Sequence, residues 1–419
     1  MTGGCPGNGQ QIMRRAGPLA ALIMPVLLLV LAACETDPAP EPTPFPTPPP
    51  INDDLPPPGD EQLNAIPRTT DARVSITGAG ATFPNVLYSV WVDEYNQLNR
   101  GVRINYQSVG SGAGIRSIID RTVDFGATDG PMDDEQKAEA PGRIIHIPAA
   151  MGAVVPSYHL RDAPDSLRFS QETIAGIFLG QVTRWDDPRI AADNPGVDFP
   201  DRDIAVCHRS DGAGTTFIWA DFMAAISDEW AETIGVGTSL RWPRGAFLGG
   251  NGNEGVAACI SQINGAIGYV EIAYAIQNDL NVALLENFDG NFVEPSLEAV
   301  TAAATGLIKA GEFPADMEAR IVNAPGPDAW PAAGFTWMLV YEELDLLGGM
   351  TLTRAQELVR YLLWTLDRDG GQRYTVPLDY APLDRAVIEL AHDAIKTITF
   401  DGQPVWETML NEQSPATSQ

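Results

Sequence analysis

The chain has 419 residues, of which 44% are hydrophobic and 19% are charged. This supplies enough apolar material for one large or two ordinary globular domains. Its 26 basic and 55 acidic residues give a formal net charge of -29. Because such a charge repels nucleic acids and anionic membrane surfaces at long range, we expect no DNA or RNA partner.

The first 33 residues have the pattern of an export signal. Arg14 and Arg15 precede an apolar run over residues 16–33, and the small residues Ala32 and Ala33 come directly before Cys34. An uncleaved anchor helix is the alternative, which the two prolines inside the run disfavour. Since the end of the run resembles a bacterial lipobox, we expect residues 1–33 to be a signal peptide and Cys34 to carry lipid.

Residues 34–71 are predicted to be a tether. They contain twelve prolines, eight acidic residues and one basic residue, Arg68. Such a segment cannot bury a core, and it favours the extended polyproline conformation at about 3.1 Å per residue. A docking motif for a partner is the alternative. Together with Cys34, this segment predicts an extracytoplasmic protein held at the cell membrane by lipid.

From residue 72 onward, short β-rich runs alternate with longer amphipathic stretches, as in an α/β protein. Strands are predicted at residues 74–77, 102–106, 123–127, 144–147, 153–155, 204–208, 266–270 and 335–340. Helices are predicted at residues 84–99, 115–121, 216–226 and 354–367. A polar tail follows at residues 412–419.

Three glycine-rich turns each join a predicted strand to a predicted helix, at residues 78–83, 110–114 and 211–216. Glycines let the backbone approach a ligand closely, and the free N–H groups of a helix's first turn attract anions. One such turn is weak support, because tight turns need glycine for steric reasons alone. Three turns that also carry Ser or Thr predict an anion site.

The spacing of these turns disfavours nucleotide binding. No Gly-Lys-Ser/Thr follows a glycine run, and no dinucleotide-binding fingerprint is present. The four histidines, at positions 146, 159, 208 and 392, are scattered and match no metal-site spacing. A secreted phosphatase would need a metal cluster or an activated nucleophile, so we expect a binding protein and no enzyme, metal or cofactor.

Several blocks carry a resemblance to the phosphate-binding proteins of ABC phosphate transporters. They are TGAGATFP from Thr77, YQSVGSGAGIRSI from Tyr106, VDFGATDGP from Val123, VTRWDDPRI from Val182, IAVCHRSDGAGTTF from Ile204 and GAIGYVEIAYA from Gly265. Weaker similarity extends the match over residues 74–399. The resemblance implies a class II periplasmic-binding-protein fold, with two lobes, a central cleft and two crossings between the lobes.

The resemblance also implies the ligand contacts. Phosphate would be held by Thr82, Phe83, Ser111, Asp129, Arg209, Gly214 and Thr215, and Asp211 would support Arg209. At the third turn the family commonly has Ser where this chain has Ala213, so one donor is missing and weaker affinity is expected. His208 is given only a role at the edge of the site. Without the resemblance, these residues could equally be caps, turn residues or a surface ion pair.

Asp129 is the informative member of this set. A carboxylate that faces an anion is repelled unless the ligand brings a proton to share, which phosphate does at neutral pH and sulfate does not. Asp129 is therefore predicted to select phosphate over sulfate. Two alternative functions stay open: the protein could bind another tetrahedral oxyanion, or it could act as a surface sensor that serves no transporter.

The predicted architecture has two lobes that close on the ligand. Lobe I comprises residues 72–151 and 333–411, lobe II comprises residues 152–332, and the crossings lie near residues 150–155 and 330–336. The partners implied are inorganic phosphate and the permease and ATPase subunits of an importer, with the protein itself a monomer. Cys207 and Cys259 could form a disulfide or remain two buried thiols.

Overall fold

The computed structural model describes residues 61–161, 163–164 and 166–413, which fall within one compact unit. The predicted signal peptide, Cys34 and most of the predicted tether lie outside the described residues. Among the described helices, none is both long and apolar enough to cross a membrane.

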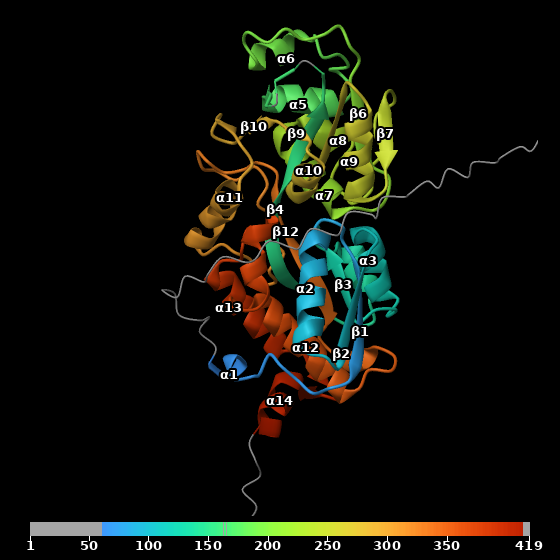
Figure 1. The fold of residues 1–419 in the computed structure, drawn as a ribbon, viewed down its shortest axis with the longest axis vertical. Coiled ribbons are helices and arrows are strands. Elements are labelled where there is room, and N and C mark those ends of the chain that lie inside the picture. The colour runs from blue at the N-terminus through green and yellow to red at the C-terminus, as the bar shows by residue number, and fades with distance from the viewer. Residues whose placement is uncertain (1–60, 162, 165, 414–419) are drawn as a thin grey trace, which may run out of the picture. The chain divides into compact units, whose positions relative to one another are not determined.

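A mixed nine-stranded sheet organises the fold (Figure 1). Its strand order is β2-β1-β3-β12-β4-β8-β6-β7, with β9 paired to β4. Its strands are β1 (Val74–Gly80), β2 (Val102–Ser108), β3 (Phe125–Thr128), β4 (Ile144–His159), β6 (Ala205–Arg209), β7 (Phe247–Gly250), β8 (Ala266–Glu271), β9 (Asn281–Val282) and β12 (Ala333–Tyr341).

Two small sheets and a set of helices complete the fold. The small sheets contain β5 (Arg168–Phe169), β10 (Leu284–Glu286) and β11 (Phe292–Val293), and β13 (Thr399–Phe400) and β14 (Gln403–Pro404). The α-helices are α1 (Glu61–Asn64), α2 (Asn85–Leu98), α3 (Ser111–Ile119), α4 (Asp134–Glu139), α5 (Gln171–Phe178), α6 (Pro188–Asp193), α7 (Gly214–Ile226), α8 (Asp228–Thr233), α9 (Gly252–Gln262), α10 (Ile272–Gln277), α11 (Leu297–Ala310), α12 (Leu352–Leu366), α13 (Arg385–Lys396) and α14 (Val405–Gln413).

Strand β4 connects the two halves of the large sheet. Its residues 144–153 pair antiparallel with β12, and its residues 154–159 pair antiparallel with β8. All but its two end residues are buried. We refer to β2, β1, β3 and β12 as the first half of the sheet, and to β8, β6 and β7 as the second half. In Figure 1 the two halves occupy the lower and upper parts of the view.

The parallel strands in each half determine where loops meet. Strand β1 pairs parallel with β2 and β3, and β6 pairs parallel with β7 and β8. The carboxyl ends of parallel strands share one edge of a sheet, and ligands of open α/β sheets bind beyond that edge. All three predicted glycine-rich turns follow such ends, since they join β1 to α2, β2 to α3 and β6 to α7.

The predicted elements are all present, with two differences. Residues 144–147 and 153–155, predicted as two strands, are parts of the single strand β4. The helix predicted from residue 115 begins at Ser111, because Gly110 at φ +93° provides a sharp entry that other residues rarely adopt. Helix α14 ends at Gln413, slightly beyond the predicted end of the fold.

The predicted tether extends too far toward the fold. Within residues 61–71, Leu63 and Ile66 are fully or almost fully buried in the core. The backbone of this segment also bonds to two helices. The Thr70 N–H donates to Asn99 Oδ1 at the end of α2, at 2.8 Å, and Arg360 of α12 donates to the carbonyl of Pro67. Burial of these two aliphatic side chains and the two hydrogen bonds contribute to ordering this segment.

A disulfide joins the second half of the sheet to a helix that the sequence analysis did not predict. Cys207 of β6 is bonded to Cys259 of α9, and the open choice between a disulfide and two thiols is thereby decided. The bond closes a separation of 52 residues. Such a loop closure typically stabilises the folded state by about 2–4 kcal/mol. It also ties the second half of α9 to the middle of β6.

Candidate functional site

The turn between β1 and α2 places Thr82 and Phe83 at the meeting point of the halves. Both side chains are buried. The carbonyl of Thr82 accepts a hydrogen bond from the Tyr274 hydroxyl at 2.7 Å, and the carbonyl of Phe83 accepts one from Tyr380, also at 2.7 Å. These two bonds fix the peptide planes of the turn. The turn lies immediately before α2, where helix N–H groups lack intrahelical acceptors.

Ser111 and Asp129 form a second buried group in the first half. The Ser111 hydroxyl donates to Asp129 Oδ2 at 3.3 Å and accepts from the Asp129 N–H at the same distance. Thr336 of β12 donates its hydroxyl to Asp129 Oδ1 at 2.7 Å. Asp129 follows β3 directly and is 2% exposed, so it is a structured acceptor at the carboxyl edge of the sheet.

Arg209, the last residue of β6, contributes a buried cation from the second half. Its guanidinium pairs with the Asp211 carboxylate, with Nε to Oδ1 at 2.8 Å and a second, shorter contact from Nη2 to Oδ2. The N–H of Gly252 also donates to Asp211, at 3.1 Å. Asp211 therefore holds Arg209 in one orientation, while Arg209 Nη1 is directed toward Thr82 and Thr215.

The start of α7 lies against the Ser111 and Asp129 group. A Cβ atom on Gly214 would come within 2.5 Å of Asp129 Oδ2 and 2.6 Å of Ser111 Oγ, so only glycine allows this approach. Thr215 follows with a fully buried hydroxyl. Ala213 is the N-cap of α7, is buried, and donates its own N–H to the carbonyl of Thr238 at 2.8 Å.

The two halves meet through these residues. Arg209 Nη1 donates to Thr82 Oγ1 at 3.0 Å, and the Gly112 N–H donates to the Gly212 carbonyl at 2.9 Å. All the residues predicted for the site, from Thr82 to Thr215, therefore lie in one cluster. Within the described residues, the cluster contains one cation, Arg209, which is already paired with Asp211. It can present hydroxyl and N–H donors to an anion.

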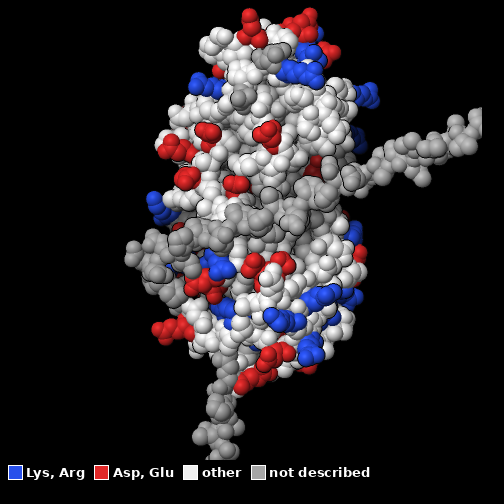
Figure 2. Space-filling model, viewed as in Figure 1, with Lys and Arg blue, Asp and Glu red and all other residues white. Residues whose placement is uncertain are grey.

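Burial controls the electrostatics of this cluster. Loss of solvent raises the pKa of Asp129 to about 7, although its hydrogen bonds from Thr336 and Ser111 and the charge of Arg209 act in the opposite direction. Burial would also raise the pKa of Asp211, but the hydrogen bonds and charge of Arg209 outweigh burial and lower it. The face shown in Figure 2 carries charges of both signs. Burial thus brings the pKa of Asp129 close to neutrality.

Two buried polar residues of the cluster were missed in the sequence. Asn253, near the start of α9, donates to Thr82 Oγ1 at 2.9 Å, and Thr336 donates to Asp129. The stretch Gly249 to Gly255 is a fourth glycine-rich turn between a strand and a helix, and it could have predicted Asn253. Thr336 lies within a buried strand and carries no local signal.

His208 lies outside the cluster's polar core. Its ring stacks on Trp242 at 4.7 Å between centroids, and Nδ1 lies 2.8 Å from the carbonyl of Arg209. Burial lowers its pKa. In the described ranges, no three His, Cys, Asp or Glu side chains are grouped as a metal site would require.

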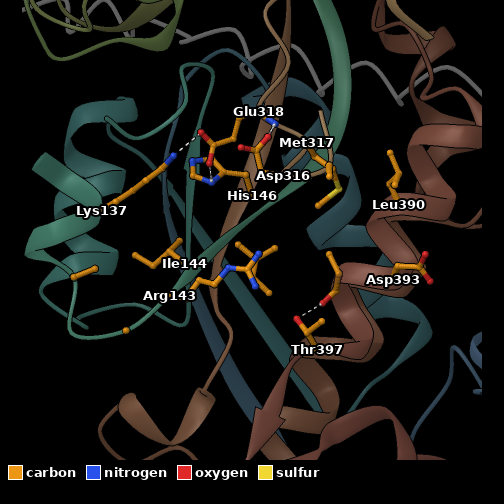
Figure 3. A pocket seen from close by; sticks show the side chains of 15 residues that line it. Lys137, Arg143, Ile144, His146, Asp316, Met317, Glu318, Leu390, Asp393 and Thr397 are labelled. Atoms are coloured by element: carbon orange, nitrogen blue, oxygen red, sulfur yellow. Dashed lines mark hydrogen bonds and ion pairs between the residues drawn. The ribbon is translucent and has the colours of Figure 1, made fainter. Parts of the chain in front are cut away.

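A cavity of about 590 Å³ lies elsewhere and contains none of the predicted site residues (Figure 3). Its wall includes Glu318, which pairs with Lys137 at 2.7 Å and with His146 Nδ1 at 3.1 Å. Burial lowers the pKa of His146 to about 3, so His146 is a neutral donor. Lys137, His146 and Glu318 already bond to one another, and none of the predicted site residues lines this cavity, so we place the candidate site at the Arg209 and Asp129 cluster.

Comparison with known proteins defines the class of the fold. Residues 67–355 match the PBP superfamily domain. A crystal structure of a phosphate-binding protein from Stenotrophomonas maltophilia superposes with a TM-score of 0.57 at 17% identity, covering 75% of this chain and 92% of that one. At this identity the superposition supports the mixed α/β fold alone.

Two sequence relatives define the family. The phosphate-binding protein PstS of Pasteurella multocida is 40% identical over 342 residues, covering 81% of this chain and 95% of the relative. PstS of Haemophilus influenzae is 39% identical over 327 residues, covering 77% of this chain and 93% of that relative. The chain therefore belongs to the PstS family of phosphate-binding proteins.

The raised pKa of Asp129 predicts a pH-dependent stability. Its folded pKa of about 7 exceeds its unfolded value near 3.9, so its stabilising contribution is complete below pH ~4 and is lost as pH rises through 7. In buffer without oxyanions at pH 8, the Asp129→Asn variant should therefore unfold at a higher urea concentration than the wild type. Its free energy of unfolding should be greater by up to about 4 kcal/mol. The gain should disappear near pH 4.

Asp93→Asn, at an exposed helical position, is the matched control and should change little at either pH. Urea unfolding of the three proteins between pH 4 and 8 measures the difference. A gain for Asp129→Asn that is the same at all pH values would contradict a raised pKa.

Proposed function

We propose that this protein binds inorganic phosphate outside the cytoplasm and delivers it to an ATP-driven phosphate importer. The observation that carries the proposal is a buried carboxylate, Asp129, set among hydroxyl and N–H donors and the cation Arg209. Membership of the PstS family supports the same ligand. The family consists of binding proteins, and we propose no catalytic step.

The donors and the acceptor together suit a protonated oxyanion. Thr82 and Thr215 offer hydroxyls, and the Ser111 hydroxyl would turn from Asp129 to the ligand. The residues at the starts of α2, α3 and α7 offer N–H groups, and all these donors suit unprotonated oxygens. Asp129 would accept the ligand's remaining proton. Sulfate at neutral pH has no proton to donate, so two acceptors would face each other in a buried site. Such a mismatch costs several kcal/mol and favours phosphate.

We further propose that the protein is a class II binding protein that closes on its ligand. Lobe I would comprise residues 72–151 and 333–411, preceded by the packed residues 61–71, and lobe II residues 152–332. The crossings would be β4 and the start of β12, since β4 pairs with strands of both halves. Because Ser111 and Asp129 belong to one lobe and Arg209 to the other, phosphate would stabilise the closed arrangement.

Attachment to the membrane is a separate part of the proposal. The signal pattern before Cys34 and the proline-rich segment after it support a lipid anchor and a tether. The anchor would keep the binding protein close to the permease and ATPase subunits that are its proposed partners. The protein is proposed to act as a monomer.

The ligand assignment predicts a specific calorimetric result. Titration of the unlipidated protein should show tight binding of phosphate and no measurable binding of sulfate. Arg209→Ala should weaken phosphate binding by about 2–5 kcal/mol, because it removes the one cation of the cluster and leaves Asp211 unpaired. Asp129→Asn should reduce the preference for phosphate over sulfate by about 10²-fold or more. Equal binding of both anions by the wild type would refute the assignment.

The same titration tests the missing donor at Ala213. Ala213→Ser should tighten phosphate binding about tenfold, since one added hydrogen bond to a charged ligand is worth roughly 1.5–3 kcal/mol. Ala225→Ser, at an exposed position of the same helix, is the control and should leave the dissociation constant unchanged. An unchanged constant for Ala213→Ser would contradict the expectation that the missing donor weakens phosphate binding.

The anchor proposal predicts a change of location. In a host that modifies lipoproteins, the wild type should fractionate with membranes and incorporate labelled palmitate. Cys34→Ser should do neither, because the acylated thiol is absent. Cys5→Ser serves as the control and should behave as the wild type. Palmitate labelling of Cys34→Ser would contradict lipidation at this position.

A further inference from the structure

Asn253 occupies the centre of the cluster without being one of its predicted ligand contacts. It is the second residue of α9 and is fully buried. Its Nδ2 lies 2.9 Å from Thr82 Oγ1 and 3.3 Å from Thr215 Oγ1. One amide group thus contacts a hydroxyl from each half of the sheet.

The orientation of this amide follows from its third contact. Asn253 Oδ1 lies 3.1 Å from the backbone nitrogen of Glu271. A backbone N–H can only donate, so the atom that faces it has to be the oxygen acceptor. The NH₂ group is therefore the one that faces Thr82 and Thr215, and toward these hydroxyls it can only donate.

Arg209 adds a second donor to the same two hydroxyls. Its Nη1 lies 3.0 Å from Thr82 Oγ1 and 3.4 Å from Thr215 Oγ1. A hydroxyl has two lone pairs and one proton, and neither a guanidinium nor an amide NH₂ can accept that proton. With both lone pairs occupied, each threonine has to donate its own proton to some other acceptor.

From this hydrogen-bond pattern we infer that Asn253 is a positioning residue that fixes the Thr82 and Thr215 hydroxyls as donors toward the ligand. The inference rests on the proposed phosphate site and refines it. Two fixed hydroxyl donors favour unprotonated ligand oxygens on that side. The ligand's remaining proton is thereby directed to Asp129, so Asn253 contributes to selecting the protonation pattern of the bound oxyanion.

Asn253 is held rigidly enough to perform this role. The disulfide between Cys207 and Cys259 ties α9 to the strand that ends in Arg209. The neighbouring Gly252, at φ +71°, donates its N–H to Asp211, the partner of Arg209. The amide and the guanidinium are thus positioned together with respect to the two hydroxyls.

Asn253→Asp replaces the NH₂ donor by a carboxylate acceptor with almost no change in the shape of the side chain. A carboxylate accepts, so it should draw the threonine protons toward itself and away from phosphate. At pH 8 phosphate should bind at least about 100-fold more weakly than to the wild type. The ratio of the two dissociation constants should fall as pH is lowered to 5, because a protonated carboxyl can again donate. Asn251→Asp adds the same charge at an exposed position two residues earlier and should leave the ratio near one at each pH.

A coupling measurement separates positioning from a general structural role. Asn253→Ala should weaken phosphate binding about tenfold in the wild type but less than threefold when Thr82→Val and Thr215→Val are already present. Equal losses in both backgrounds, or a pH-independent ratio for Asn253→Asp, would overturn the inference while the phosphate site stands. Absence of phosphate binding in the wild type would overturn both.

Discussion

A single buried guanidinium holds the site together. Arg209 ends a strand in one half of the sheet, pairs with Asp211 beside it, and donates to Thr82 in the other half. A buried cation without a partner would cost several kcal/mol, so Asp211 is a condition for having Arg209 there at all. Because Asp211 occupies Nε and Nη2, the face that remains, Nη1, is directed to the threonine hydroxyls. The geometry of the cluster depends on this division of the guanidinium nitrogens between Asp211 and the threonine hydroxyls.

The net charge of -29 is compatible with an anion site of this kind. Surface charges are screened over about 8 Å at physiological salt, and those on the face in Figure 2 carry both signs. Hydroxyl and N–H dipoles act at contact distance and need no reorganisation when the ligand arrives. In the proposed site Asp129 would add selectivity, because its buried carboxylate can accept a proton that the ligand brings.

Local sequence patterns predicted the three turns and most of the surrounding strands and helices. Contacts between residues far apart in the sequence could not be predicted in this way. Glycine-rich turns between strands and helices depend on backbone geometry, so the three predicted turns appeared where expected. The continuity of β4 was missed because Pro148, Gly152 and Pro156 interrupt its pattern, although pairing with β12 and β8 sustains the strand. Thr336 reaches Asp129 across a separation of 207 residues, which no local pattern reveals.

Closure around the ligand is the most direct consequence of a site divided between two halves. Small-angle X-ray scattering of the unlipidated protein, with and without saturating phosphate, measures it, because any contribution from the N-terminal segment is common to both samples. Phosphate should reduce the radius of gyration, and sulfate at the same concentration should not. An unchanged radius with bound phosphate would contradict a site that is completed when the two halves meet.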